Sequence, residues 1–196
     1  MKRILAYLFI VLGLGLVVSV KADDIRDFQI EGISVGDKIL DHVSKKEYSK
    51  RKKREYKYKN IFATIVFENK KYLTYEKVRF HYKLNDKNRI IYGVEGQIYF
   101  PDKIHECLKK KENIVTEIAP IVSNTKRYNK TWDHWADKKG KSKVHETIFR
   151  FTSGDVISIQ CFDWSDEITK EKRWPDNLKV GVQTKDIVDF FKSLNK

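Results

Sequence analysis

Two pairs of segments in which apolar and polar residues alternate limit what this chain can fold into. In residues 78–84, valine, phenylalanine, tyrosine and leucine alternate with arginine, histidine and lysine, and the alternation resumes over residues 90–100 after a short polar turn. Residues 147–151 and 157–161 repeat this arrangement around a Ser-Gly turn. Because successive side chains of a strand point to opposite faces, each pair predicts a β-hairpin with one buried face.

Three helices and two further strands are expected around these hairpins. Residues 37–48, 102–118 and 184–194 repeat apolar side chains at helical spacing. Residues 61–67 and 178–182 are rich in β-branched and aromatic residues, which favours strands. The resulting order is α-βββ-α-βββ-α, and strands grouped between separate helices predict an α+β fold with mostly antiparallel sheet.

Two polar segments without a clear period flank the second hairpin. Residues 123–143 and residues 164–177 together contain all four tryptophans. A tight turn in the hairpin would place Lys143 opposite Trp164, so both segments should leave the hairpin at the same end. Long irregular segments in a compact domain usually have a function or pack on themselves.

The tryptophans of these segments therefore have two interpretations. One is an aromatic-lined binding site for a sugar, a peptide or a flat ligand. The other is a small satellite cluster of rings that covers the end of the core. The candidate ligand-binding residues are Trp132, His134, Trp135, Trp164 and Trp174.

Residues 1–22 are predicted to be a cleavable signal peptide. A basic Met-Lys-Arg start precedes 17 uncharged residues, and the small residue Ala22 precedes the expected cleavage before Asp23. An uncleaved inner-membrane anchor is the alternative, because an apolar stretch of this length approaches what spans a bilayer. Both interpretations place residues 23–196, a single α+β domain, outside the cytoplasm, in the periplasm or secreted.

The chain has two cysteines, Cys107 and Cys161. Export would place them in an oxidising compartment, where disulfides persist, and two cysteines allow one intramolecular pairing. Cys107 lies on the apolar stripe of its predicted helix, and Cys161 shares a strand face with Ile157 and Ile159. We expect a disulfide; two buried free thiols are the alternative.

Basic residues outnumber acidic ones. The formal net charge is +13, and removing Lys2, Arg3 and Lys21 with the signal peptide leaves +10. Either an anionic partner or the lysine-rich composition of an A+T-rich genome accounts for this balance. Residues 45–59 contain nine basic and two acidic side chains. Outside the cytoplasm such a run could bind anionic lipid, lipopolysaccharide or extracellular nucleic acid, or form a solvated loop. The candidate anionic-surface residues are Lys50, Arg51, Lys52, Lys53 and Arg54.

Motifs that carry catalysis are missing from the sequence. It lacks the metalloprotease, nucleophile-elbow, phosphate-loop and Cys-x-x-Cys patterns, and its five histidines lack metal-ligand spacing. We therefore assign no catalytic residue, metal or cofactor, and expect His81 to be a solvated surface residue. A non-catalytic binding or accessory module is favoured. A peripheral envelope protein docked through residues 45–59 comes second, and a hydrolase with a loop-borne site third.

Three stretches carry a resemblance to a known group. They are Ile30-Glu-Gly-Ile-Ser-Val-Gly-Asp-Lys-Ile-Leu-Asp-His42, Ile91-Tyr-Gly-Val-Glu-Gly-Gln-Ile-Tyr-Phe100 with Cys107 behind it, and Phe151-Thr-Ser-Gly-Asp-Val-Ile-Ser-Ile-Gln-Cys-Phe-Asp163. Together they resemble small exported proteins from A+T-rich marine alphaproteobacteria of the SAR11 type. The resemblance implies a Gram-negative periplasm and accounts for the lysine content. The group has no established activity, so the resemblance transfers no site residues.

Overall fold

The computed structural model describes residues 24–52, 55–68 and 72–194, so the predicted signal peptide lies outside the described residues. Its strands are β1 (Tyr56–Tyr58), β2 (Phe62–Phe67), β3 (Lys77–Lys83), β4 (Ile91–Tyr99), β5 (Lys126–Asp133), β6 (Lys143–Arg150), β7 (Val156–Asp163) and β8 (Asn177–Gln183). Its helices are the short 3-10 helix η1 (Ile25–Asp27), α1 (Ile39–His42), α2 (Lys45–Lys52), α3 (Ile104–Ile118), α4 (Asp166–Lys172) and α5 (Lys185–Leu194).

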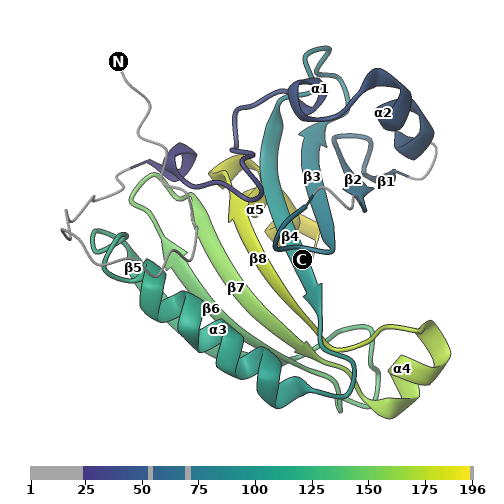
Figure 1. The fold of residues 1–196 in the computed structure, drawn as a ribbon, viewed down its shortest axis with the longest axis vertical. Helices are drawn as coiled ribbons and strands as arrows, with labels where there is room; N and C mark the ends of the chain where they lie inside the picture. Colours follow the sequence, from purple (N-terminus) through teal and green to yellow (C-terminus); the bar gives the residue numbers. More distant parts are fainter. Residues whose placement is uncertain (1–23, 53–54, 69–71, 195–196) are drawn as a thin grey trace.

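All eight strands form one antiparallel sheet in the order β1-β2-β3-β4-β8-β7-β6-β5. The first four strands form one meander and the last four form another, and β4 pairs with β8 at the centre (Figure 1). This confirms the predicted α+β class and the antiparallel sheet. Each half consists of four strands followed by a helix, one strand more than the predicted plan.

The predicted order α-βββ-α-βββ-α needs correction in four places. The expected helix over residues 37–48 is divided into α1 and α2, because Val43 is extended, with φ −130° and ψ 145°. The Ser44 hydroxyl then accepts a hydrogen bond from the Glu47 N–H at 3.1 Å, which caps the first turn of α2. The edge strands β1 and β5 were missed, and so was α4, which begins after the capping residue Ser165.

The register of the second hairpin also differs from the prediction. The Phe151 N–H donates to the Asp155 carbonyl, and the longer turn pairs Lys143 with Asp163 instead of Trp164. The extra residue places Phe149 opposite Ile157, so that apolar side chains of both strands point to the same face.

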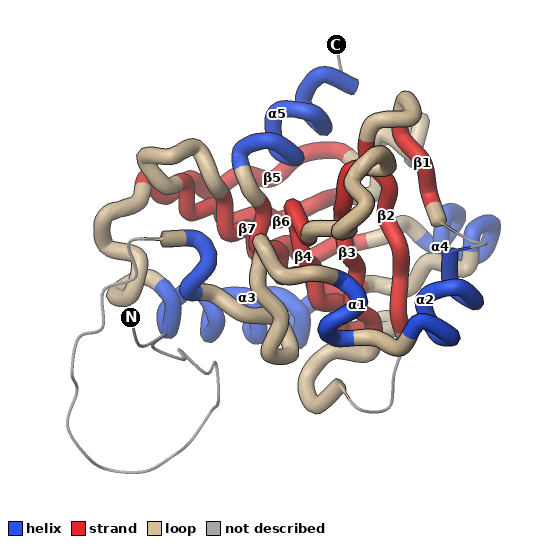
Figure 2. Tube along the Cα trace, turned by 90° about the horizontal axis from the view of Figure 1, so that it is seen from above, coloured by secondary structure: helices blue, strands red, loops and turns tan. Residues whose placement is uncertain are grey.

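One face of the sheet, which we call the packed face, carries the core. Its central row contains Phe80, Val94, Val182 and Ile157, which are at most 2% exposed. Helix α3 packs across β7 and β8 on this face, and the segment from Gly36 to α2 covers the strands of the first half (Figures 1 and 2). The residues before it lie by the second half, where the Phe28 ring is 6.1 Å from that of Phe151. Helix α5 lies on the opposite side of the sheet (Figure 2).

None of the described helices is long and apolar enough to cross a lipid bilayer.

Cys107 of α3 and Cys161 of β7 form the predicted disulfide. Their Cα atoms are 6.0 Å apart, and both side chains are fully buried between helix and sheet. The bridge therefore fastens α3 to the second half of the sheet.

Replacing both Cys107 and Cys161 with alanine should lower the free energy of unfolding by about 4 kcal/mol, because the bridge closes a loop of 54 residues in the unfolded chain. Urea denaturation monitored by circular dichroism measures the change. Cys107→Ala alone should have nearly the same effect, and wild-type protein with reductant should approach it. A loss smaller than about 1 kcal/mol in the double variant would contradict this stabilising role.

Candidate functional site

The face of the sheet opposite α3 carries polar side chains at its centre, and we call it the polar face. Three rows of residues cross it, one residue from each strand. They are Arg79, Glu95, Gly181 and Ser158; then Gln97, Lys179, Gln160 and Glu146; then Tyr99, Asn177, Phe162, Val144 and Trp132. Polar residues that lie far apart in the sequence therefore meet across the β4–β8 pair.

Helix α5 covers one end of the polar face. The Phe190 ring lies 4.9 Å from Phe62, and the Phe191 ring lies 5.4 Å from His81. His81 is consequently only 4% exposed, so the expectation of a solvated surface residue was wrong. Its Nδ1 lies 2.7 Å from the Thr64 hydroxyl, and its Nε2 lies 3.3 Å from Glu95.

The other end of the polar face meets an aromatic cluster, which consists of Trp132, His134, Phe162, Trp164 and Trp174. The His134 ring lies 4.5 Å from Trp164 and 5.9 Å from Trp132, and Trp164 lies 4.9 Å from Trp174. Phe162 stacks on Trp164 at 5.8 Å, with 22° between the rings. The structure thus brings the predicted segments together through direct ring contacts.

Trp135 is the fifth predicted residue, and it lies at the outside of this cluster. Its ring is 5.3 Å from His134 and its side chain is 72% exposed. Trp174 is 38% exposed, whereas His134 is 8% exposed. The cluster therefore has a buried imidazole at its centre and indole rings that reach solvent.

His134 is held as a neutral hydrogen-bond acceptor. Its Nδ1 accepts from the Ala136 N–H at 3.1 Å, and its own backbone N–H donates to the Ser142 carbonyl at 2.9 Å. Burial, with a smaller contribution from the charge of Lys179, lowers the pKa of His134 to about 4. The side chain is therefore uncharged near neutral pH.

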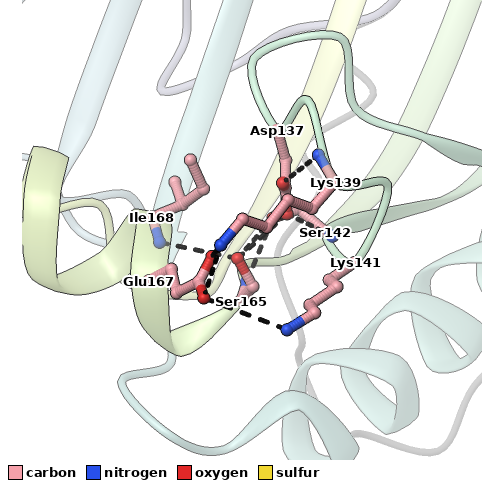
Figure 3. Close-up of polar contacts among 7 residues, drawn as sticks. All are labelled: Asp137, Lys139, Lys141, Ser142, Ser165, Glu167 and Ile168. Carbon is pink, nitrogen blue, oxygen red and sulfur yellow. Dashed lines mark hydrogen bonds and ion pairs between the residues drawn. The ribbon is translucent and has the colours of Figure 1, made fainter.

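Asp137 joins the two loops that carry the tryptophans (Figure 3). Its Oδ2 accepts from the Ser142 N–H and hydroxyl, both at 2.8 Å, and from the Ser165 hydroxyl at 2.9 Å. The Ser142 hydroxyl bond is the largest of the effects that hold the pKa of Asp137 well below its usual range. Farther out, Glu167 pairs with Lys139 at 2.9 Å. The carboxylate thus fixes the β5–β6 loop against the start of α4.

These contacts show whether the two loops hold a nucleophile and a base in the arrangement that a hydrolase needs. The hydroxyls of Ser142 and Ser165 both donate to Asp137, and His134 accepts from a backbone N–H, so the three side chains do not form a nucleophile–base pair. In the described part of the chain, no group of three or more His, Cys, Asp or Glu side chains is placed to hold a metal ion.

Several buried polar atoms of the polar face and the aromatic cluster have no hydrogen-bond partner among the described residues. They are Arg79 Nη1, Gln97 Oε1, Asn177 Oδ1, Trp132 Nε1 and Trp164 Nε1. Gln97 and Asn177 are each only 4% exposed. Leaving one such group unpaired costs about 1–3 kcal/mol, and buried polar groups of native proteins are normally paired with protein, water or ligand.

Charged groups are concentrated beside these atoms. Glu95 Oε1 accepts from Gln183 at 2.9 Å and lies 3.3 Å from His81. Burial by itself would raise the pKa of Glu95, but the nearby His81, Lys179 and Arg79 hold it well below its usual range. Burial lowers the pKa of Lys179 to about 8, and Arg79 adds to this effect.

The basic run lies away from this site. Lys50, Arg51 and Lys52 belong to α2, on the packed-face side of the sheet, and Lys53 and Arg54 lie outside the described residues. Tyr48 fixes α2 to the core, and its hydroxyl donates to that of Tyr82. A shallow, open depression beside α2, lined by Ser49, Lys52, Glu55 and Lys57, is well separated from the aromatic cluster.

Sequence reasoning did not include the polar residues of the site. Phe162 was detectable, because it follows Cys161 and must point to the opposite face of β7. Arg79, Glu95 and Lys179 alternate with apolar residues and looked like the solvated side of half-buried strands. Their proximity depends on the pairing of β4 with β8, which local patterns do not encode.

No protein-family model matches this chain, and neither the curated proteins nor the solved structures include a significant match. Function has to be inferred from the polar face and the aromatic cluster themselves.

The His134→Gln variant should remove a pH-dependent loss of stability. In the unfolded chain the imidazole takes up a proton near pH 6.5, whereas the folded protein resists protonation until about pH 4. Protons therefore favour unfolding in this window, and wild-type stability should fall as the pH decreases from 6.5 to 4. Urea denaturation at several pH values measures this fall.

Glutamine keeps a hydrogen-bond acceptor at position 134 but does not titrate, so the variant should lose much less stability over the same window. His105→Gln, on the exposed side of α3, is the matched control and should behave like the wild type. Equal slopes for wild type and His134→Gln would show that the imidazole is not shielded.

Proposed function

We propose that this protein is an exported, non-catalytic binding module whose ligand binds where the aromatic cluster meets the polar face. One observation carries the proposal: the buried indole N–H groups of Trp132 and Trp164 and the buried side-chain oxygens of Gln97 and Asn177 all lack partners. A ligand that offers both acceptors and donors would pair them.

The chemistry of the cluster supports binding rather than catalysis. Its rings provide flat apolar surface, and its indole N–H groups are donors in fixed positions. Asp137 fixes the loops, so little side-chain entropy has to be lost when a ligand binds. His134, the central side chain, is uncharged and already accepts a hydrogen bond. A flat ligand, a sugar or a peptide with exposed carbonyl groups suits such a surface.

Export is part of this proposal. The basic, apolar and small-residue regions at the start of the sequence favour a cleavable signal peptide, and periplasmic or secreted material should begin at Asp23. The buried disulfide between Cys107 and Cys161 is compatible with an oxidising compartment.

Tryptophan fluorescence provides the test, because all four tryptophans of the chain lie in or beside the cluster. Titration with monosaccharides, aromatic amino acids and short peptides should reveal at least one class that shifts the emission. Trp164→Phe should then weaken binding about tenfold, because it removes a donor and part of a ring surface.

Tyr56→Phe is the control for this measurement. Tyr56 is a 63% exposed residue of the edge strand β1, and this variant should bind like the wild type. If no class of compound shifts the emission, or if Trp164→Phe binds as tightly as the wild type, the proposed site is wrong.

Docking on an anionic membrane through residues 45–59 is a second proposal. It is supported by the exposed Lys45, Lys46, Lys50 and Lys52 of α2, which form no ion pair with any residue in the described ranges. Each lysine near an anionic surface contributes on the order of 1 kcal/mol, and salt screens the attraction.

Changing Lys50, Arg51, Lys52, Lys53 and Arg54 to glutamine should abolish sedimentation with phosphatidylglycerol vesicles at low salt. The control replaces five dispersed lysines, which lowers the net charge equally: Lys109, Lys126, Lys138, Lys170 and Lys172. This control should still sediment. Wild-type protein that ignores such vesicles at low salt would end the docking proposal.

A further inference from the structure

We propose that the ligand of the aromatic cluster is anionic, and that its carboxylate or phosphate group binds between Arg79 and Lys179 on the polar face. This inference rests on the proposed binding function and names the chemical class of its ligand. It follows from the charge balance, the unpaired donors and the position of Phe162.

Positive charge at the centre of the polar face exceeds negative charge. The central rows contain four cations, of which Lys77 is paired with Glu68 and Lys130 with Glu146. Arg79 and Lys179 are the two that form no ion pair, and Glu95 is the carboxylate between them. The other carboxylate, Glu146, accepts from Gln160 at 2.6 Å and pairs with Lys130 at 3.0 Å. Glu146 is therefore neutralised locally, and one positive charge of the pair Arg79 and Lys179 is left without a counter-charge.

Neither Arg79 nor Lys179 has the ion pair or hydrogen bond that normally accompanies a cation removed from water. Arg79 and Lys179 form no ion pair within 4.0 Å and no side-chain hydrogen bond with the described residues, and Arg79 Nη1 is buried. Glu95 attracts both cations, but it carries a single negative charge and its Oε1 also contacts Gln183 and His81, so it balances only one of them. Both residues are half-buried, so their charged groups are partly removed from water without gaining an acceptor from the protein, and a bound anion would supply the missing acceptors.

The geometry of the two donors suits an oxyanion. A guanidinium group presents a planar fork that matches carboxylate and phosphate oxygens, and an ammonium group adds a point charge. Gln97 lies beside Lys179 in the same row, and its unpaired Oε1 would accept a hydrogen bond from a donor group of the same ligand.

Phe162 connects this anion site to the aromatic cluster. The Lys179 Nζ lies 4.0 Å from the centre of the Phe162 ring, and that ring stacks on Trp164. Phe162 itself is only 5% exposed, so a ligand whose anionic group contacts Lys179 would place an attached flat group against the neighbouring rings of Trp164 and Trp174. An aromatic or otherwise planar carboxylate or phosphate ester has this shape.

Isothermal titration calorimetry with four probes tests the inference: 2-naphthoate, 2-naphthyl phosphate, the neutral 2-naphthamide and inorganic phosphate. At least one of the two aromatic anions should bind ten or more times more tightly than the amide. The stronger of the two identifies carboxylate or phosphate as the preferred group. Inorganic phosphate should bind more weakly than the aromatic anions, because it has no ring to contact the indole rings of the cluster.

Lys179→Met and Arg79→Met should each weaken binding of the aromatic anion at least tenfold without changing that of the amide. Lys77→Met is the matched control, because Lys77 lies on the same face but is already paired with Glu68 at 2.9 Å. Lys179→Arg, which keeps the charge, should retain most of the affinity, and thermal unfolding verifies that each variant folds.

Two failures are distinguishable. If the amide binds as tightly as the aromatic anions, or if Lys179→Met and Lys77→Met behave alike, the anion site is wrong and the binding function stands. If none of the four probes binds and no compound shifts the tryptophan emission, the binding function fails, and the anion site fails with it.

Discussion

The pairing of β4 with β8 is the interaction on which the rest of the structure depends. It joins the two meanders over seven residue pairs, from Gly93–Gln183 to Tyr99–Asn177. Two glycines in this ladder allow close approach on opposite faces. A Cβ atom on Gly96 would lie 2.4 Å from the Tyr75 ring on the packed face, and one on Gly181 would lie 2.9 Å from the Ser158 hydroxyl on the polar face. Without the ladder neither the continuous core nor the rows of polar residues would form.

The two faces of this sheet are stabilised by different interactions. The packed face relies on apolar burial under α3 and on the disulfide, which are strong and insensitive to pH. On the polar face, buried ion pairs and hydrogen bonds are incomplete, so the interactions that specify its arrangement contribute less net stability. A protein whose core is stable can tolerate a face with unpaired polar groups. Such unpaired groups are the ones with which a binding site contacts its ligand.

Local patterns predicted the strands that contribute to the core and failed for the two exposed edge strands. Strands β3, β4, β6 and β7 alternate because one face meets the core, whereas β5 is exposed on both faces and carries no period. The same limit applies to the site. The tryptophans were predicted from their concentration in two loops, but the polar face requires partners 80 or more residues apart, as in the hydrogen bond between Gln183 and Glu95, which are separated by 88 residues.

The strand order also determines when the chain is able to fold. The strand at the centre of the sheet, β8, is the last of the eight described strands along the sequence, and it pairs with both β4 and β7. Without residues 177–183, each meander has one open edge. These edges are β4 and β7, and both expose apolar side chains and unpaired backbone N–H and C=O groups. Such a topology makes folding a late, whole-chain event of high contact order. A chain in which β8 has not yet paired is therefore prone to aggregate through the open edges of β4 and β7.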